Sequence, residues 1–146
     1  MRRRKTFISI LIAALVLYGL LIIDSANKEA RKIELEKKVI GYIQKHEHNG
    51  QLHINFSKDL NLSFDKVYIF PPYTPEKEIK QHLGPRSQDL KPYGIHYRDD
   101  ISLLVFVQNQ EIKNVVELPS KYEVTHPGKP HQPYLIPSTV QINVAT

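Results

Sequence analysis

The chain has 146 residues, with 20 lysines and arginines against 15 acidic residues, a formal net charge of +5 and no cysteine. The lack of cysteine excludes a disulfide framework, a thiolate metal site, a cysteine nucleophile and a lipid-modified cysteine. The excess charge is local: residues 2–5 carry four positive charges, which leaves 16 basic against 15 acidic residues elsewhere. Because phosphate binding needs a basic patch or stripe, the sequence argues against nucleic acid as a partner.

The first element in the chain is an apolar stretch, Thr6–Ile23, of eighteen residues without a charge, twelve of which are Leu, Ile, Val or Phe. Near the bilayer centre these twelve contribute on the order of −4 to −7 kcal/mol toward insertion. As a helix the stretch is about 27 Å long, slightly short of a hydrocarbon core of roughly 30 Å. The residues that follow, Asp24-Ser25-Ala26, offer no Ala-x-Ala cleavage site. An uncleaved membrane anchor is therefore favoured over a secretory signal peptide.

Basic residues on the two sides of this stretch predict its orientation. The cluster at residues 2–5 favours a cytoplasmic N-terminus, although five basic residues within about 15 residues of the other end oppose it: Lys28, Arg31, Lys32, Lys37 and Lys38. The chain is thus expected to lie at the cell membrane. It would comprise a cytoplasmic flank (1–5), an anchor in contact with lipid (6–23), an amphipathic linker helix (24–49) and an extracytoplasmic domain (50–146).

The linker helix is predicted over Ser25–Lys45, and Asn49-Gly50 ends it. Its apolar residues recur near helical spacing, with charged residues opposite: Ala30, Ile33, Leu35, Val39, Ile40, Tyr42 and Ile43. Two roles fit this stripe, a stalk that dimerises or a helix whose second half packs on the following sheet. Packing is favoured, because barely two heptads are present and a coiled coil needs at least three.

The clearest strand signal is Val67–Phe70, whose β-branched and aromatic residues indicate a strand buried on both faces. Pro71 and Pro72 cannot donate to a strand ladder and end it. A short helix should follow, with Thr74 as N-cap, Pro75 at the first helical position and a stop at Gly84.

Other strands are predicted from alternation and turn residues. One half-buried strand contains Leu52, Ile54 and Phe56. A hairpin is predicted from Ile101–Gln108 and Glu111–Leu118, with Asn109-Gln110 as its turn. A last strand, at an edge, contains Val140, Ile142 and Val144. Residues 85–98 are predicted to be a surface loop and residues 125–138 an extended segment. The predicted fold class is α+β: the two N-terminal helices are followed by a small, mostly antiparallel sheet with one short helix.

One part of this pattern resembles a known group of proteins. It consists of Asp65-Lys66-Val67-Tyr68-Ile69-Phe70, then Pro72-Tyr73-Thr74, Asp99-Asp100, Leu104-Val105-Phe106-Val107 and Val116-Glu117-Leu118. Between about residues 60 and 118 the chain resembles an uncharacterised group of small exported or membrane-anchored bacterial proteins. The resemblance implies a compact α+β fold and an extracytoplasmic address, and it carries no catalytic residue.

The first candidate site is the corner Pro72-Tyr73-Thr74. Loops on a rigid scaffold often carry function, and tyrosine is enriched in interface hot spots. Further aromatic residues could extend a recognition face: Tyr68, Phe70, Tyr93, Tyr97, Tyr122 and Tyr134. The alternative is that Tyr68 or Phe70 fills the core while the prolines merely shape the turn.

Two other clusters contain chemically active residue types. His96, Asp99 and Asp100 would suit acid–base hydrolysis, but adjacent aspartates before a strand more often make a turn. His46, His48 and His53, with His126 and His131 further on, would suit a metal ion, but histidines at a helix end also suit the helix dipole.

The favoured hypothesis is a non-enzymatic binding module of the bacterial envelope, which contacts another envelope protein. An anchored hydrolase (His96, Asp99, Asp100) and a metal-binding envelope protein (His46, His48, His53) are the alternatives. The favoured hypothesis requires no catalytic residue, metal ligand or cofactor.

Overall fold

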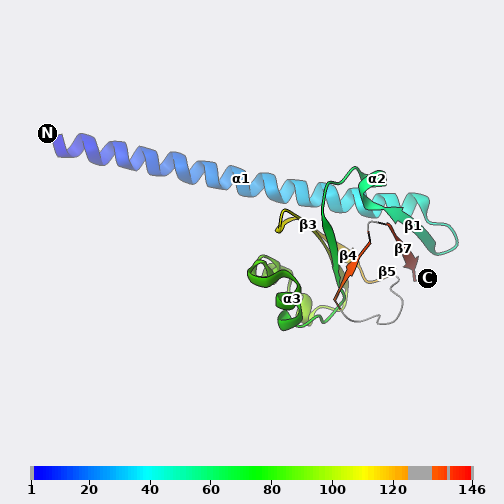
Figure 1. The fold of residues 1–146 in the computed structure, drawn as a ribbon. Helices are drawn as coiled ribbons and strands as arrows, with labels where there is room; N and C mark the ends of the chain where they lie inside the picture. The colour runs from blue at the N-terminus through cyan, green and yellow to red at the C-terminus, as the bar shows by residue number, and fades with distance from the viewer. Residues whose placement is uncertain (1, 125–132, 138, 146) are drawn as a thin grey trace. The chain divides into compact units, whose positions relative to one another are not determined.

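The structure is a computed structural model that describes residues 2–124, 133–137 and 139–145, with side chains except those of residues 2–11 and 13. The chain divides into two units, Met1–Glu34 and Leu35–Thr146. Helix α1 (Arg2–His46) is continuous and contributes to both, so the two helices predicted from the sequence are one (Figure 1). Within the part of the chain that the structure describes, no helix is both long and apolar enough to cross a membrane.

The second unit is a domain of helices and antiparallel strands. After α1 come β1 (Gln51–Asn55), α2 (Phe56–Leu60), β2 (Lys66–Phe70), α3 (Glu76–Leu83), the 3-10 helices η1 (Gly84–Tyr93) and η2 (Ile95–Tyr97), β3 (Ile101–Gln108), β4 (Glu111–Pro119), β5 (Tyr122–Val124), β6 (Tyr134–Ile136) and β7 (Thr139–Val144). The strands pair in the orders β1-β7-β5 and β4-β3-β2-β6, and every pairing is antiparallel. The predicted α+β class is confirmed, with two sheets rather than one.

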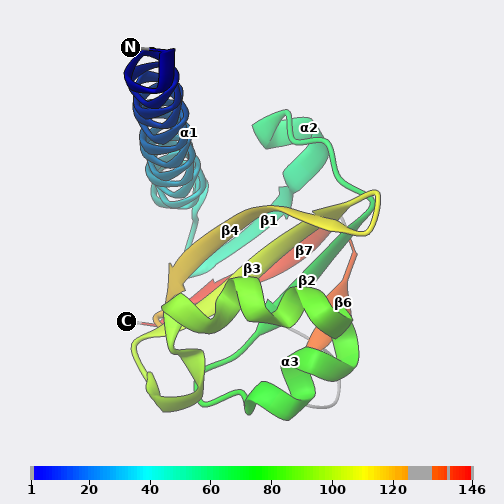
Figure 2. The same cartoon turned by 90° about the vertical axis from the view of Figure 1, so that its left-hand side faces the viewer.

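The four-stranded sheet is the middle layer of the domain, as its longest buried strand shows. Residues 101–107 of β3 are all buried. Because successive side chains of a strand point to opposite faces, Leu104 and Phe106 join one hydrophobic cluster, while Leu103 and Val105 join another. Helices α3 and η1 cover the face of the second cluster (Figure 2).

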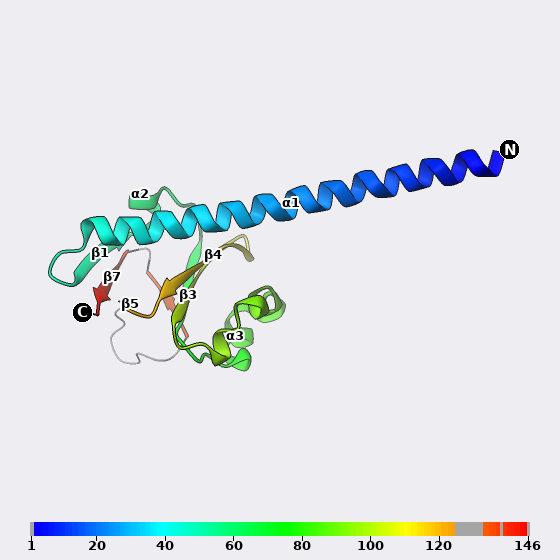
Figure 3. The ribbon, with the colours of Figure 1, turned by 180° about the vertical axis from the view of Figure 1, so that it is seen from behind.

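The end of α1 packs on the opposite face. Leu35, Val39 and Ile43 recur every fourth residue, so they lie along one side of the helix, and all three are buried in the first cluster with residues of β1, β5 and β7. Views from opposite sides place this end of α1 and helix α3 on different sides of β3 (Figures 1 and 3). The predicted packing of the second half of the helix on the sheet is confirmed.

Strand β2 is the central strand that the sequence predicts. It pairs with β3 on one side and β6 on the other, and Val67, Ile69 and Phe70 are buried. The predicted start of the following helix is wrong by one residue. Thr74 does not cap α3; Pro75 holds the N-cap position, with no side-chain cap hydrogen bond.

The β3–β4 hairpin is also confirmed. Gln108 pairs with Glu111, so Asn109 and Gln110 form a two-residue turn, with positive φ angles of 52° and 62°. Asp65 supports this turn, because its Oδ2 accepts a hydrogen bond from the backbone N–H of Asn109 at 2.7 Å.

Three other predictions are wrong. Phe56 does not extend β1 but begins α2, because the side chain of Asn55 accepts a hydrogen bond from the backbone N–H of Lys58 and caps a helix there. The loop predicted at 85–98 contains η1 and η2. Strand β7 is not at an edge but lies between β1 and β5. Of the segment 125–138, residues 125–132 and 138 lie outside the described residues, and Tyr134–Ile136 is a strand.

Candidate functional site

The corner after β2 is a tight turn with a tyrosine in an unfavourable conformation. The backbone N–H of Thr74 donates to the carbonyl of Pro71 at 3.3 Å, and Tyr73, at the third position of the turn, has a φ of 61°. Proline at the second position and positive φ at the third define a type II turn, which normally has Gly or Asn at the third. A non-glycine residue in this region costs on the order of 1–3 kcal/mol.

Two contacts hold this strained turn. The backbone N–H of Tyr73 donates to the carbonyls of both Ile95 and Arg98, at 3.0 and 3.1 Å, so the two ends of η2 bind it. The hydroxyl of Thr74 donates to the carbonyl of Pro71 at 2.6 Å, and the side chain is buried. Thr74 is therefore part of the support of the turn, whereas Tyr73 is 58% exposed.

An apolar pocket of about 610 Å³ adjoins this corner. Pro72 and Tyr73 line it, together with tyrosines and aliphatic residues from four strands: Ile69, Tyr122, Val124, Tyr134 and Val144. Its polar lining consists of Ser102, Ser120, Glu123 and Asn143. Of the predicted aromatic face, the structure thus brings Tyr73, Tyr122 and Tyr134 to one pocket. Phe70 is fully buried instead, and Tyr68 packs beside it with ring centroids 6.2 Å apart.

Tyr134 fixes one wall of this pocket. Its hydroxyl donates to the carbonyl of Val124 at 2.8 Å and so joins β6 to β5. Burial, followed by the nearby carboxylate of Glu123, raises the pKa of the Tyr134 hydroxyl to about 12. The Tyr134 hydroxyl therefore stays protonated and remains a hydrogen-bond donor across the physiological pH range.

The predicted acid–base residues are not brought together. His96 Nδ1 lies 3.8 Å from Glu76 Oε1 of α3. Asp100 instead accepts two hydrogen bonds from Arg98, from Nε at 2.8 Å and from Nη2 at 2.6 Å. Among the described residues, no hydrogen bond or ion pair joins His96 to Asp99 or Asp100.

Arg98 connects the segment before β3 to a neighbouring strand. It lies between Asp100 and Glu117 of β4, which its Nη1 contacts at 2.9 Å, and these partners raise its pKa above the ordinary value. The hydrogen bond from Arg98 in turn lowers the pKa of Asp100. The chain bends at Asp99 and Asp100 before β3, and Arg98 joins this bend to the neighbouring strand.

The predicted histidine cluster is also divided between separate roles. The Nδ1 atom of His46 hydrogen-bonds to the carbonyl of Tyr42 at 3.0 Å and its ring stacks on the Tyr42 ring, while His48 makes a bridge with Gln51. His53 is exposed on β1. In the described part of the chain no three His, Asp or Glu residues are grouped as metal ligands would be. His126 and His131 lie outside the described residues.

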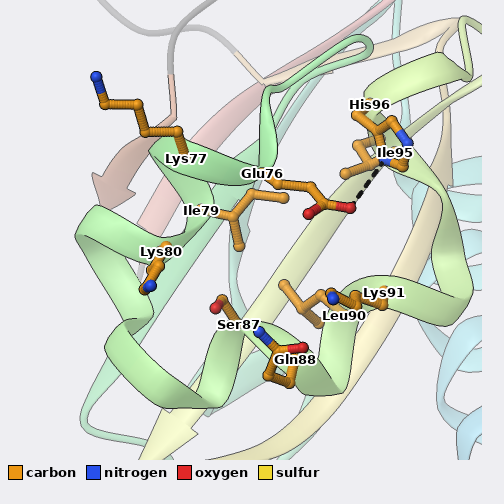
Figure 4. A pocket seen from close by; sticks show the side chains of 10 residues that line it. All are labelled: Glu76, Lys77, Ile79, Lys80, Ser87, Gln88, Leu90, Lys91, Ile95 and His96. Carbon is orange, nitrogen blue, oxygen red and sulfur yellow. Dashed lines mark ion pairs between the residues drawn. The ribbon is translucent and has the colours of Figure 1, made fainter.

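A second pocket was not predicted from the sequence. It measures about 350 Å³ and lies between α3, η1 and η2 (Figure 4). Its apolar part is Ile79, Leu90 and Ile95, all nearly fully buried. The only sequence signal for it was the pair Leu90 and Ile95 inside a polar, proline-containing segment.

The chain matches no family model, and no curated protein or solved structure matches it significantly.

Proposed function

We propose that this protein is a single-pass, membrane-anchored interaction module of the bacterial envelope, which docks a protein partner at the corner Pro72–Tyr73 and the adjoining apolar pocket. One observation carries the proposal: an exposed tyrosine occupies a backbone position that favours glycine, and two hydrogen bonds keep it there. Residues held in sparsely populated backbone conformations cluster at binding and active sites, which is the reason for placing the docking surface here.

The docking surface offers a partner two features. Tyr73 presents an exposed amphipathic ring, and large, rigid aromatic side chains of this kind lose little conformational entropy on binding. The pocket beside it can bury an apolar side chain, while Glu123 at its lining can pair with a basic one. The partner that fits is an extended protein segment with an apolar residue next to a lysine or arginine.

The anchor is proposed from the composition of residues 6–23 alone, since no helix among the described residues qualifies as a membrane span. Residues 6–23 carry no charge, and the large apolar side chains described between Ile12 and Ile23 are 52–68% exposed. Apolar side chains exposed on all sides of a helix need an apolar surrounding, which a bilayer supplies. The basic residues 2–5 favour a cytoplasmic N-terminus and an extracytoplasmic domain.

Site-specific crosslinking tests the docking surface. A photoreactive phenylalanine at position 73 should crosslink a discrete partner in intact membranes. The same residue at position 53, which is exposed on β1, should not. The variant Tyr73→Gly should compete poorly for this partner while remaining folded. Equal crosslinking from both positions, or full competition by Tyr73→Gly, would refute the docking surface.

Fractionation and protease treatment test the anchor separately. The full-length protein should stay with membranes after alkaline carbonate extraction, and the domain should be digested from outside once the outer layers are permeabilised. A protein extracted by carbonate would refute the anchor. A domain that is protected outside but digested in inverted vesicles would refute the orientation.

A further inference from the structure

We infer that the pocket between α3, η1 and η2 binds a small organic anion, an apolar ring or short chain that carries a carboxylate or phosphate group. This inference does not depend on the proposed function, since the pocket shares no lining residue with the pocket beside Tyr73.

The size and floor of the pocket suit a small ligand. Its volume of about 350 Å³ is in the range of small-molecule sites, roughly 300–1,000 Å³. Ile79, Leu90 and Ile95 provide an apolar floor that belongs to the second hydrophobic cluster and is therefore held by the core. Ser87 and Gln88 of η1 add polar side chains that can hydrogen-bond to a ligand.

The charge at the opening favours an anion. Lys80 from α3 and Lys91 from η1 lie on two sides of the pocket (Figure 4). In the part of the chain that the structure describes, neither lysine has an ion pair or a hydrogen bond to an acidic side chain. Lys77 adds a third positive charge to the lining, although its amine points away from the floor (Figure 4).

The single acidic residue of the lining lies beside a histidine, and among the described residues no ion pair joins it to a lysine. The carboxylate of Glu76 points toward His96, with 3.8 Å between Oε1 and Nδ1 (Figure 4). The lysines therefore keep their charge available for a ligand, and the excess of cations over the one carboxylate makes an organic anion a better fit than a cation. The apolar floor makes an organic anion a better fit than a bare inorganic one.

Saturation-transfer NMR on the full-length protein in lipid nanodiscs tests this inference. The probes are benzoate and phenyl phosphate, which distinguish a carboxylate from a phosphate ligand, with benzyl alcohol as the neutral counterpart. Empty nanodiscs correct for partition into lipid. At least one anion should bind saturably, and benzyl alcohol should bind roughly tenfold more weakly because it lacks the charge.

Two variants and a matched control locate the site. The double variant Lys80→Gln/Lys91→Gln should bind the anion roughly tenfold more weakly. Ser87→Leu should block the floor while leaving the lysines in place. Lys45→Gln with Lys58→Gln removes the same charge at exposed positions outside the pocket and should leave binding unchanged.

Each other outcome overturns the inference. Equal loss in the two lysine pairs would show a general charge effect, and equal binding of benzyl alcohol would show an apolar pocket without anion preference. Unsaturable signals, or binding unchanged in Ser87→Leu and in the Lys80/Lys91 variant, would place the probes elsewhere. Thermal unfolding of each variant confirms that the protein tested is folded.

Discussion

Tyr73 has a strained backbone conformation that hydrogen bonds nevertheless maintain. Its φ of 61° disfavours any side chain, and yet its N–H is bonded to two carbonyls and its turn is closed by Thr74. Glycine would satisfy the same backbone hydrogen bonds without the strain. Tyr73 is more than half exposed, so the core does not require its side chain.

A pair of substitutions separates the backbone strain from the ring. Tyr73→Gly and Tyr73→Ala both remove the ring, but only glycine relieves the positive φ. We expect the glycine variant to have a free energy of unfolding about 1 kcal/mol higher than the alanine variant. Urea unfolding of both proteins in the same detergent measures this difference. Equal stabilities would mean that the turn is not strained at this residue.

Asp100 gives the domain a defined pH dependence. Its pKa in the folded state lies below the ordinary value of 3.8, mainly because Arg98 donates hydrogen bonds to it. A lowered folded pKa stabilises the fold above the ordinary pKa, and this contribution is lost as pH falls through the folded value. Wild type should therefore be more stable than Asp100→Asn at pH 7, and the two should converge below about pH 4.

The neighbouring aspartate is a matched control for this experiment. Asp99 is exposed, and within the described residues it makes no hydrogen bond or ion pair. Urea unfolding at several pH values should show no comparable convergence for Asp99→Asn. If Asp100→Asn and wild type differ by the same amount at pH 3 and pH 7, the ion pair with Arg98 does not stabilise the fold.

At the scale of elements, strands were easier to predict than their neighbours. The run Val67–Phe70 and the hairpin around Asn109-Gln110 could be recognised locally, because composition and turn position decide them. The position of β7 within its sheet could not be predicted. Alternating apolar residues show that one face of a strand is buried, but not which strands lie on either side of it. Proline suggested a loop at 85–98, whereas η1 tolerates Pro85 near its start and Pro92 near its end.

The candidate site was predictable only in part. The corner Pro72-Tyr73-Thr74 could be located because prolines must end β2 and loops carry function. Which of the three residues is exposed could not be predicted. That depends on the carbonyls of Ile95 and Arg98, more than twenty residues away in the sequence, which bind the backbone N–H of Tyr73.

The hairpin turn provides a test at this scale. Gln110 has a φ of 62° in a two-residue turn, where glycine is the usual residue. We expect Gln110→Gly to raise the free energy of unfolding by about 1 kcal/mol. Asn109→Gly should raise it less, because asparagine tolerates positive φ better than glutamine. Thermal unfolding of the two variants compares them, and a loss of stability in Gln110→Gly would contradict the turn geometry.

At the scale of the whole molecule, one helix serves two units. Beyond Leu35, α1 belongs to the domain and contributes Val39 and Ile43 to its core, both fully buried. Before that point the large apolar side chains described between Ile12 and Ile33 are exposed, Ile33 at 46%. Apolar residues at helical spacing are therefore buried in the domain core from residue 35 onward and exposed at Ile33.

Substitutions before and after residue 35 should have very different effects on the free energy of unfolding. Ile43→Ala leaves a cavity in the core and should lower the free energy of unfolding of the domain by about 2–5 kcal/mol. Ile33→Ala should change it by less than about 0.5 kcal/mol, as exposed positions do. Urea unfolding, followed by tyrosine fluorescence, measures both. A large effect of Ile33→Ala that depends on protein concentration would instead support the dimerising stalk.

The position of β7 has a consequence for how the domain is made. Among the strands that the structure describes, β1 and β5 each pair with β7 and not with each other. A growing polypeptide that has emerged as far as Val124 therefore carries both outer strands of this sheet without the one that unites them. Leu52 and Ile54 cannot pair with Ile142 and Val140 until those residues have been synthesised. The three-stranded sheet can therefore close only after β7 has been synthesised, whereas β2, β3 and β4 can pair before it.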